Sequence, residues 1–358
     1  MKKLKVYFLG GVYESCYYVR CLIPLLANLW DGDRTNLERK PPDTKKIVEG
    51  LTRNDILVFH RPMDRKVLEL AKEMQKIGKK IVMDNDDTYI KDSGVPTVML
   101  GRLRKDLEEK VQIFDDNLKD FASIADMVTV STEFLKKEYD PYCKNVVVLP
   151  NCVDKRDWFK PKKNEGDKVR IGIVGSVASN QDYQPIIPLL ESLKDREDVQ
   201  IVLFALPEKN DNNQLVSKMY KPEFDFWNKY KPDWRPFVQT KDYPFVLNNL
   251  KLDMMLIPRH DSYFNRCKSN LKFLEASMCQ IPVVAQGFED GMSPYQGEED
   301  SKYMLVATTD EEWKESVEKL IADKSLRDNM GEKAYNYVVE NYDITNNKDL
   351  WVEAYKKL

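Results

Sequence analysis

Basic and acidic side chains gather in one short segment of the second half of the chain, in a spacing that suits phosphate binding. The segment reads as a helix, and Lys268, Lys272 and Glu275 are expected to share one of its faces. Arg266 and Lys268 fall at its amino end, where the helix dipole disfavours each cation by about 0.3–1 kcal/mol. A bound anion reverses that cost, because charge-assisted hydrogen bonds contribute about 1.5–3 kcal/mol each. We therefore predict a diphosphate site here.

Two further residues of this segment refine the prediction. Glu275 lies one turn further along the helix, where a carboxylate accepts the hydroxyl protons of a ribose diol. Ser269 is expected at the N-cap or in the first turn, with its hydroxyl and amide directed at the same anion. A plainer alternative stays open: a solvated basic face whose lysines pair with acids such as Asp261, while Glu275 pairs with Lys272 or Lys268.

Two glycine-containing turns follow predicted strands, at the edge where ligands of parallel sheets collect. Gly10 and Gly11 end the first strand, and Gly175 and Ser176 follow the first strand of the second half. Glycine lets a ligand approach the backbone closely. Each pair alone is equally compatible with a tight turn.

An acidic run, Asp84-Asn85-Asp86-Asp87, follows another predicted strand of the first half. We expect Asp84, Asp86 or Asp87 to orient the hydroxyl groups of an acceptor, with strand-end capping and turn formation as the alternative. Such a run also suits a divalent cation. We do not predict a metal, because the run lies in the other half from the predicted diphosphate site, where lysines supply the neutralising charge. His60, at the end of a neighbouring strand, is a lesser candidate for the same site.

The composition excludes several other functions. The 358 residues are 42% hydrophobic and carry a net charge of −3, which fits about two folded domains and weakens the case for nucleic-acid binding. Two histidines exclude zinc chemistry built on several histidines. Six cysteines without a C-x-x-C pair favour the reducing cytoplasm. No apolar run approaches the roughly 18 residues of a membrane span, so at most peripheral membrane contact is expected.

Short β-branched runs alternate with amphipathic helical segments, the pattern of parallel strands joined by crossover helices. The expected strands are 4–9, 55–59, 80–83, 127–130 and 146–149 in the first half, and 169–174, 200–204, 253–257 and 282–285 in the second. The clearest helix covers 102–121, with an apolar residue every three or four positions. A lysine-rich stretch from Asp154 to Lys168 separates the halves, and the chain reads as helical from Thr309 onward.

Four segments together resemble glycosyltransferase family 4. They are S-T-E-F-L from Ser131, V-V-L-P-N-C-V-D from Val147, I-G-I-V-G-S from Ile171 and K-S-N-L-K-F-L-E-A-S-M from Lys268, followed by I-P-V-V-A. The resemblance covers nearly the whole chain and implies an α/β fold of GT-B architecture, with two Rossmann-like parallel-sheet domains facing across a cleft. It implies an acceptor-side domain at 1–155, a nucleotide-sugar domain at 165–330, and C-terminal helices at 331–358 that pack back towards the first domain.

The activity implied by the resemblance is a retaining, metal-independent transfer of a sugar from a UDP- or GDP-linked donor to a hydroxyl acceptor. A glycan or a lipid-linked saccharide of cell-surface polysaccharide biosynthesis is the expected acceptor. Glu275 matches the ribose-binding glutamate of the family, and F-V-Q-T-K-D-Y, from Phe237 to Tyr243, matches the stretch beside the nucleobase. The implied donor-site residues are Gly10, Gly11, Gly175, Ser176, Val238, Lys268, Ser269, Lys272 and Glu275.

Three departures from the family pattern keep alternatives open. Cys267 stands where the family has a first motif glutamate, Cys152 replaces the glycine of P-N-G-V-D, and Asp84 begins the acidic run where many members have a histidine. A catalytically impaired sugar-nucleotide-binding protein would fit the loss of the glutamate. A sugar-nucleotide epimerase of the same fold would use first-domain carboxylates such as Asp84 or Asp86.

Overall fold

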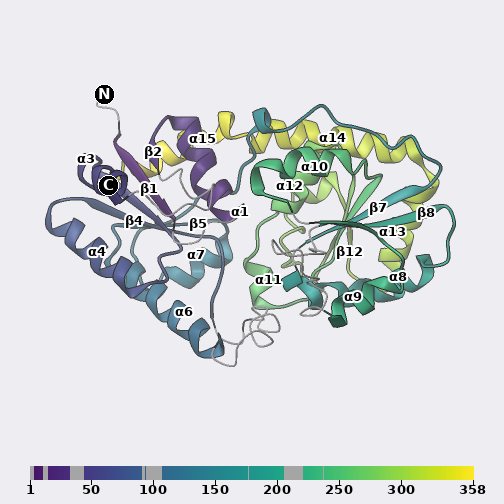
Figure 1. The fold of residues 1–358 in the computed structure, drawn as a ribbon, viewed down its shortest axis with the longest axis horizontal. Helices are drawn as coiled ribbons and strands as arrows, with labels where there is room; N and C mark the ends of the chain where they lie inside the picture. The colour runs from purple at the N-terminus through teal and green to yellow at the C-terminus, as the bar shows by residue number, and fades with distance from the viewer. Residues whose placement is uncertain are drawn as a thin grey trace. The chain divides into compact units, whose positions relative to one another are not determined.

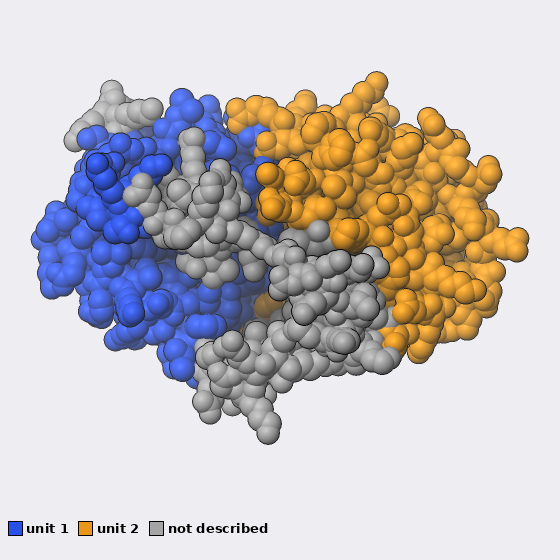
Figure 2. All heavy atoms as spheres, viewed as in Figure 1, with its two compact units in different colours: residues 1–154, 266–269, 341–358 blue, residues 155–265, 270–340 orange. Residues whose placement is uncertain are grey.

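The structure is a computed structural model that describes residues 4–10, 15–32, 44–90, 93, 107–175, 177–204, 221–236 and 238–358. The chain forms two compact units, coloured separately in Figure 2. Unit 1 comprises residues 1–154, 266–269 and 341–358, and unit 2 comprises residues 155–265 and 270–340. The chain therefore returns to unit 1 twice.

Unit 1 is built on a six-stranded parallel sheet in the order β2-β1-β3-β4-β5-β6. Helices α4 and α6 lie on one side of this sheet, and α1 and α15 lie on the other (Figure 1). Its strands are β1 (Val6–Gly10), β2 (Asp31–Gly32), β3 (Ile56–His60), β4 (Lys80–Asn85), β5 (Met127–Val130) and β6 (Val146–Val148). Its helices are α1 (Ser15–Tyr17), the π-helix η1 (Tyr18–Leu22), α2 (Ile23–Asn28), α3 (Thr44–Arg53), α4 (Arg65–Lys76), α6 (Leu107–Ile124), α7 (Glu133–Tyr139) and α15 (Ile344–Tyr355).

The last helix completes the core of unit 1. Trp351 and Tyr355 of α15 are buried in one cluster with Phe8 and Trp30, and the Tyr355 ring lies 5.6 Å from that of Trp30. Asp343 caps the helix by accepting a hydrogen bond from Thr345 N. Buried aromatic side chains contribute much of the packing energy of such a core, so the sheet of unit 1 is covered only when the end of the chain returns to it.

Unit 2 is built on a second six-stranded parallel sheet, in the order β12-β11-β10-β7-β8-β9. Figure 1 shows it between α10, α12 and α14 on one side and α8, α9 and α13 on the other. Its strands are β7 (Val169–Val174), β8 (Val199–Phe204), β9 (Asp233–Arg235), β10 (Met254–Ile257), β11 (Val283–Gln286) and β12 (Leu305–Ala307). Its longer helices are α8 (Ile187–Leu193), α9 (Lys221–Asn228), α10 (Tyr243–Asn249), α11 (Tyr263–Cys267), α12 (Leu271–Met278), α13 (Asp310–Ala322) and α14 (Lys324–Tyr342), and its 3-10 helices are η3 (Lys155–Asp157), η4 (Val177–Ile186), η6 (Thr240–Asp242) and η7 (Asp300–Tyr303).

Two Rossmann-like parallel sheets with crossover helices confirm the predicted fold class. All nine predicted strands form, and β5 and β7 have the predicted bounds. The edge strands β2, β9 and β12 were not predicted, because strands of two or three residues leave no periodic signal. The predicted helix 102–121 is described from Leu107 and runs on to Ile124. The second return to unit 1 begins at residue 341, within α14, and not at residue 331.

The described part of the chain holds no helix that is both long and apolar enough to span a membrane.

Candidate functional site

A row of four residues crosses the carboxyl edge of the unit 1 sheet. Gly10 of β1 pairs with His60 of β3, His60 pairs with Asp84 of β4, and Asp84 pairs with Thr129 of β5. Paired residues on neighbouring strands point to the same face. At Gly10, a Cβ atom would lie 2.3 Å from the Tyr17 ring. The absent side chain at Gly10 therefore makes room for Tyr17.

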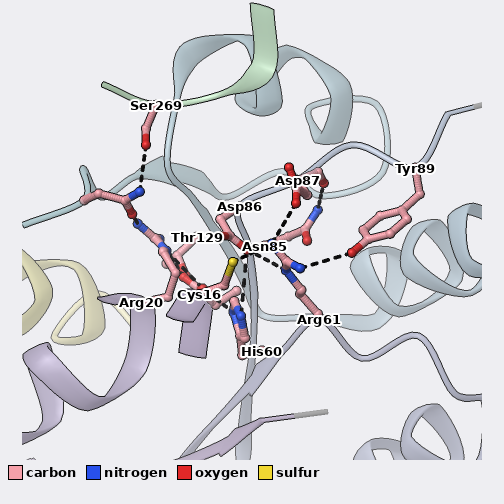
Figure 3. Close-up of polar contacts among 12 residues, drawn as sticks. Cys16, Arg20, His60, Arg61, Asn85, Asp86, Asp87, Tyr89, Thr129 and Ser269 are labelled. Carbon is pink, nitrogen blue, oxygen red and sulfur yellow. Dashed lines mark hydrogen bonds and ion pairs between the residues drawn. The ribbon is translucent and has the colours of Figure 1, made fainter. Parts of the chain in front are cut away.

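Asp84 is the centre of this row and is fully occupied by protein donors. Its Oδ2 accepts from Arg20 Nη2 at 2.7 Å and from Thr129 Oγ1 at 2.7 Å, and its Oδ1 accepts from Arg20 Nε at 3.2 Å and lies 2.9 Å from His60 Nδ1. Burial alone would raise the pKa of Asp84, but the Arg20 charge and the bonds from His60 and Arg20 hold it below its usual value. Asp84 is therefore a buried anion that fixes the side chains of Arg20, His60 and Thr129, and Figure 3 labels these three side chains.

His60 is held in a single orientation. A carboxylate only accepts hydrogen bonds, so His60 Nδ1 carries the proton that faces Asp84. Its Nε2 is buried without a hydrogen-bond partner among the described residues, 3.8 Å from Asp86 Oδ1. One buried ring nitrogen of His60, Nε2, is thus aimed towards the acidic run.

Arg61 organises the rest of that run. It directly follows β3 with a positive φ of 49°, a conformation that bulky side chains rarely adopt and that functional sites often retain. Its guanidinium donates to Asp86 Oδ1 at 2.6 Å, to Asp87 Oδ2 at 2.8 Å and to Cys16 Sγ at 3.1 Å. Burial, together with Asp86, raises the pKa of the Cys16 thiol to about 12, so Cys16 is no thiolate nucleophile near neutral pH.

The segment 266–269 joins this cluster from far along the chain. Lys268 Nζ forms a close ion pair with Asp87, and Ser269 Oγ accepts from Asn151 Nδ2 at 2.8 Å. Asn151 Oδ1 in turn accepts from Arg20 Nη1 at 3.1 Å. The Pro150-Asn151-Cys152 segment therefore links the Asp84 network to the residue that follows Lys268.

The charges of the unit 1 cluster balance. Three carboxylates (Asp84, Asp86 and Asp87) face three cations (Arg20, Arg61 and Lys268). The Sγ of Cys21 also lies within 4.8 Å of the ligand atoms of His60 and Asp84, a grouping of metal-ligand types. A cation there would have to displace the buried Arg20 guanidinium from Asp84. The donor set therefore does not fit a metal ion.

Unit 2 carries a smaller polar arrangement on α12. Glu275 Oε2 accepts from Tyr243 Oη at 2.9 Å and pairs with Lys272 Nζ at 3.1 Å. The Tyr243 ring stacks on Phe204, the last residue of β8, with 5.6 Å between the centroids, and Lys272 Nζ lies 5.3 Å from the Tyr243 centroid. Burial and the Glu275 charge raise the pKa of Tyr243, so its phenol stays protonated and donates to Glu275.

Asp182 fixes the loop that leads from β10 into α11. It lies in η4, and its Oδ1 accepts from Asn265 Nδ2 at 2.6 Å and from His260 N at 3.0 Å. Its Oδ2 accepts from Arg259 Nη1 at 2.9 Å. The Asp182 carboxylate thus connects the segment after β7 to the loop after β10. That loop leads through α11 to Lys268.

Two predictions for the lysine segment are wrong in detail. Lys268 precedes α12, because the helical structure is interrupted after α11 and α12 begins at Leu271. Ser269 is not the N-cap, which is Asn270, and the Asn270 side chain donates to Asp300 Oδ2 at 2.6 Å instead of capping the helix. Lys268 is therefore not a surplus cation on the helix, since Asp87 matches its charge.

The other predicted residues take the following places. Lys272 and Glu275 lie on α12 as expected, and they form the intrahelical ion pair that the plainer alternative described. Gly175 follows β7 and donates its N–H to Phe204 O at 3.2 Å. Val238 is half-buried in an irregular segment. Gly11 and Ser176 lie outside the described residues.

Several site residues escaped the sequence analysis. Arg20 carries a signal, since it is the one charged residue within the apolar run Cys16–Leu26, a setting that favours a buried ion pair. Arg61 directly follows the candidate His60 in the sequence but was not singled out. Thr129 lies in a segment that was predicted as a strand, and Asn151 lies in one of the segments that resemble the family. Asp182 and Arg259 show no sequence signal, because 77 residues separate the partners.

The comparisons with known proteins agree with the observed fold. The sequence profile of the family described as Glycosyl transferases group 1 matches residues 154–337. No protein of curated function matches the sequence. Among solved structures, sucrose-phosphate synthase from Thermosynechococcus elongatus is 12% identical, with 99% of this chain and 98% of that chain covered and a TM-score of 0.66.

Two further solved structures have the same fold. HepE from Anabaena, solved in complex with UDP-glucose, is 14% identical, with 99% of this chain and 100% of that chain covered and a TM-score of 0.63. A glycosyltransferase from Rickettsia africae is 12% identical, with 100% of this chain and 99% of that chain covered and a TM-score of 0.62. At these identities, the likeness establishes the GT-B fold.

Proposed function

The chain belongs to the group 1 glycosyl transferases, and from this premise we propose that it moves a sugar from a nucleotide-diphosphate sugar to a hydroxyl acceptor, with retention of anomeric configuration and without a metal ion. The proposed donor is UDP- or GDP-linked, and the proposed acceptor is a glycan or a lipid-linked saccharide of cell-surface polysaccharide biosynthesis. Six free cysteines, five of them buried, support a cytoplasmic location.

The arrangement of Tyr243, Lys272 and Glu275 carries the proposal. A carboxylate and an ammonium group stand side by side on α12, which are the two groups that a ribose diol and its diphosphate require. Tyr243 occupies Oε2 of Glu275, and no residue that the structure describes donates to Oε1. We assign Oε1 to the ribose hydroxyls and Lys272 Nζ to the diphosphate.

The ion pair between Lys272 and Glu275 does not prevent that exchange. The side chains keep 26% and 12% of their surface exposed, and i, i+3 ion pairs on a helix contribute about 0.2–0.5 kcal/mol. A charge-assisted bond to phosphate contributes about 1.5–3 kcal/mol. The exchange from carboxylate to diphosphate is therefore favourable, and it frees Glu275 to accept the ribose.

Lys268 and Ser269 are proposed as further diphosphate ligands. Lys268 has to leave Asp87 for this, and Asp87 stays matched because its Oδ2 still accepts from Arg61 at 2.8 Å. The movement of Lys268 thus leaves no unpaired buried carboxylate, which would be the costly outcome. Gly175, Ser176 and Val238 are proposed to border the donor, and Gly10 and Gly11 to be the first domain's contribution to the donor site.

The proposed reaction breaks the bond between the anomeric carbon and the diphosphate oxygen, and forms the bond to the acceptor oxygen on the same face. The departing diphosphate oxygen takes the acceptor proton, so no protein base is needed. Lys268 and Lys272 stabilise the charge that develops on the diphosphate. The carboxylates of the acidic run are already paired with Arg20, Arg61 and Lys268 and so do not offer a site for a metal ion. We therefore assign the neutralisation of the diphosphate to lysine side chains instead of a metal ion.

The geometry favours different roles for the two first-domain carboxylates. Both oxygens of Asp84 already accept hydrogen bonds from Arg20, Thr129 and His60, so we propose Asp84 as a positioning residue for His60 and Arg20. Asp86 Oδ1 accepts from Arg61 at 2.6 Å and lies near the buried Nε2 of His60. We propose that this pair orients an acceptor hydroxyl by hydrogen bonding, while the hydroxyl proton passes to the departing diphosphate oxygen.

The test is a panel of UDP- and GDP-sugars with chelator present and release of the nucleoside diphosphate as the readout. We expect Lys272→Ala to lower the release at least about tenfold, and the exposed control Lys319→Ala to leave it unchanged. Near-normal turnover by Lys272→Ala would contradict the diphosphate assignment. Donor binding without transfer or hydrolysis would identify a binding protein, and a changed donor sugar without acceptor would identify an epimerase.

A further inference from the structure

Unit 2 exposes two phenylalanine rings that contact each other. Phe159 follows η3 and Phe245 lies on α10, and their centroids are 5.5 Å apart at an interplanar angle of 77°. Each keeps 51% of its surface exposed. An exposed edge-to-face pair of this kind is unusual, because aromatic contacts normally remove both rings from water. Half-buried Trp158 and Val246 are the chain neighbours of the two rings.

The loop that carries Phe159 is fixed to α10. Buried Asn248 accepts from Lys162 N at 3.0 Å and donates to Lys160 O at 2.9 Å. Asn249 Oδ1 also accepts from Lys162 Nζ at 2.7 Å. These bonds hold the backbone on both sides of Pro161 against the helix. The two rings therefore stand on a rigid support, and exposing them is a fixed property of the fold.

Basic residues lie close to both rings in the sequence. Exposed Lys155, Arg156, Lys160 and Lys162 lie within four residues of Phe159, and exposed Lys241 of η6 precedes Phe245 by four residues. The acids at this surface are Asp157 and Asp242. Lys163 is directed elsewhere, since its Nζ pairs with Asp328 at 3.2 Å. The surface formed by Phe159, Phe245 and these basic residues, here the aromatic-basic surface, has a net positive charge.

We propose that the aromatic-basic surface docks unit 2 onto an anionic lipid bilayer. Aromatic rings prefer the headgroup level of a membrane, and lysines next to them bind anionic lipids with about 1 kcal/mol each. A small apolar ridge with a basic rim fits a penetration of about 5–10 Å into the headgroup boundary. A protein partner would more often meet a wider and flatter apolar area. The proposal does not depend on the donor chemistry, although it would bring the enzyme to lipid-linked acceptors.

The test is sedimentation of the full chain with vesicles made of equal parts of phosphatidylglycerol and phosphatidylcholine, and with vesicles of phosphatidylcholine alone. We expect binding to the first kind only, and weaker binding as salt is raised. Phe159→Ser with Phe245→Ser should lower the binding constant about tenfold or more. Lys160→Gln with Lys241→Gln should lower it about fivefold for each lysine.

Matched controls keep the test specific. Met292→Ser removes a side chain of unit 2 that is 50% exposed, and Lys333→Gln removes an exposed lysine on α14; both should bind like the wild type. Equal binding by all variants, or charge-independent binding to phosphatidylcholine, would overturn the proposal. If the chain does not bind vesicles but associates with itself, and the double variant Phe159→Ser with Phe245→Ser abolishes this association, the surface binds a second copy of the chain instead. Nucleoside diphosphate binding in solution is measured separately, so its loss would concern only the proposed function.

Discussion

Replacing Arg20 by methionine tests the network at the carboxyl edge of unit 1. The Arg20 guanidinium is buried and donates twice to Asp84, once to Asn151 Oδ1 and once to Leu149 O at 2.5 Å. Methionine fills much of the volume but leaves Asp84 as an unpaired buried anion. Removal of one partner of a buried ion pair costs about 3–5 kcal/mol, which is a large share of the roughly 5–15 kcal/mol of a typical domain.

Hydrogen exchange of the two units gives the assay an internal control. Amides of β4 and β5 should lose protection by about 100-fold or more in Arg20→Met, whereas amides of β7 and β8 in unit 2 should keep theirs. Adding Asp84→Asn should restore part of the loss, because no unpaired charge then remains. Lys76→Met, which removes an exposed ion pair with Glu73 on α4, serves as the surface control and should leave protection unchanged.

The pH dependence of the same variant has a defined sign. The native pKa of Asp84 is lowered, so its contribution to stability is present above the ordinary carboxyl pKa and is lost as pH falls through the native value. Without Arg20 that contribution disappears. The difference in the free energy of unfolding between the wild type and Arg20→Met should therefore become smaller as the pH is lowered. If Arg20→Met lowers the free energy of unfolding at neutral pH by no more than about 1 kcal/mol, which is the range of an exposed ion pair, the proposed network is refuted.

Three other variants test separate features of the fold. Burial raises the pKa of Glu138 on α7 to about 7 from 4.5, with Asp115 and Asp87 adding to the shift and Lys119 opposing it. The ionised form therefore destabilises the protein as pH rises through that range, by about 3 kcal/mol in full. Glu138→Gln should accordingly raise the Tm at about pH 8 and change it little at about pH 5, and equal shifts at both values would contradict the assignment. Gly331→Ala should destabilise unit 2 by about 1–3 kcal/mol in urea unfolding, because its Cβ would lie 2.2 Å from the backbone oxygen of Gln280; a neutral effect would show that α14 does not pack there. Trp351→Ala should cost about 3–5 kcal/mol and loosen β1 rather than β7 in hydrogen exchange, and loosening of β7 would place α15 elsewhere.

The regular parts of the fold followed from the sequence because burial leaves a periodic signal. The runs Met127–Val130 and Val169–Val174 are fully or largely buried inner strands in which Thr129 and Arg170 are the only polar residues, and their bounds were predicted. The strand Asp233–Arg235 is a short edge strand without such a run. Its place is set by pairing with β8, a tertiary contact that local sequence does not encode.

The candidate site was predictable in its residue types and in its local pairings, but not in its long-range pairings. The spacing on α12 correctly placed Lys272 next to Glu275, because an i, i+3 relation is a local property of a helix. Lys268 was misplaced, since its partner Asp87 lies 181 residues away and no spacing rule reaches that far. The same reason hid the contact of Arg20 with Asp84, which depends on how the π-helix η1 lies over the sheet.

The central claim is that Lys272 and Glu275 bind the nucleoside diphosphate part of a sugar donor. Titration calorimetry with UDP, GDP and the matching monophosphates in the presence of chelator measures it directly. We predict that one diphosphate binds clearly tighter than its monophosphate, that Lys272→Ala removes this preference, and that Glu275→Gln weakens both ligands alike. Equal affinity of Lys272→Ala and wild type for the diphosphate would contradict the account.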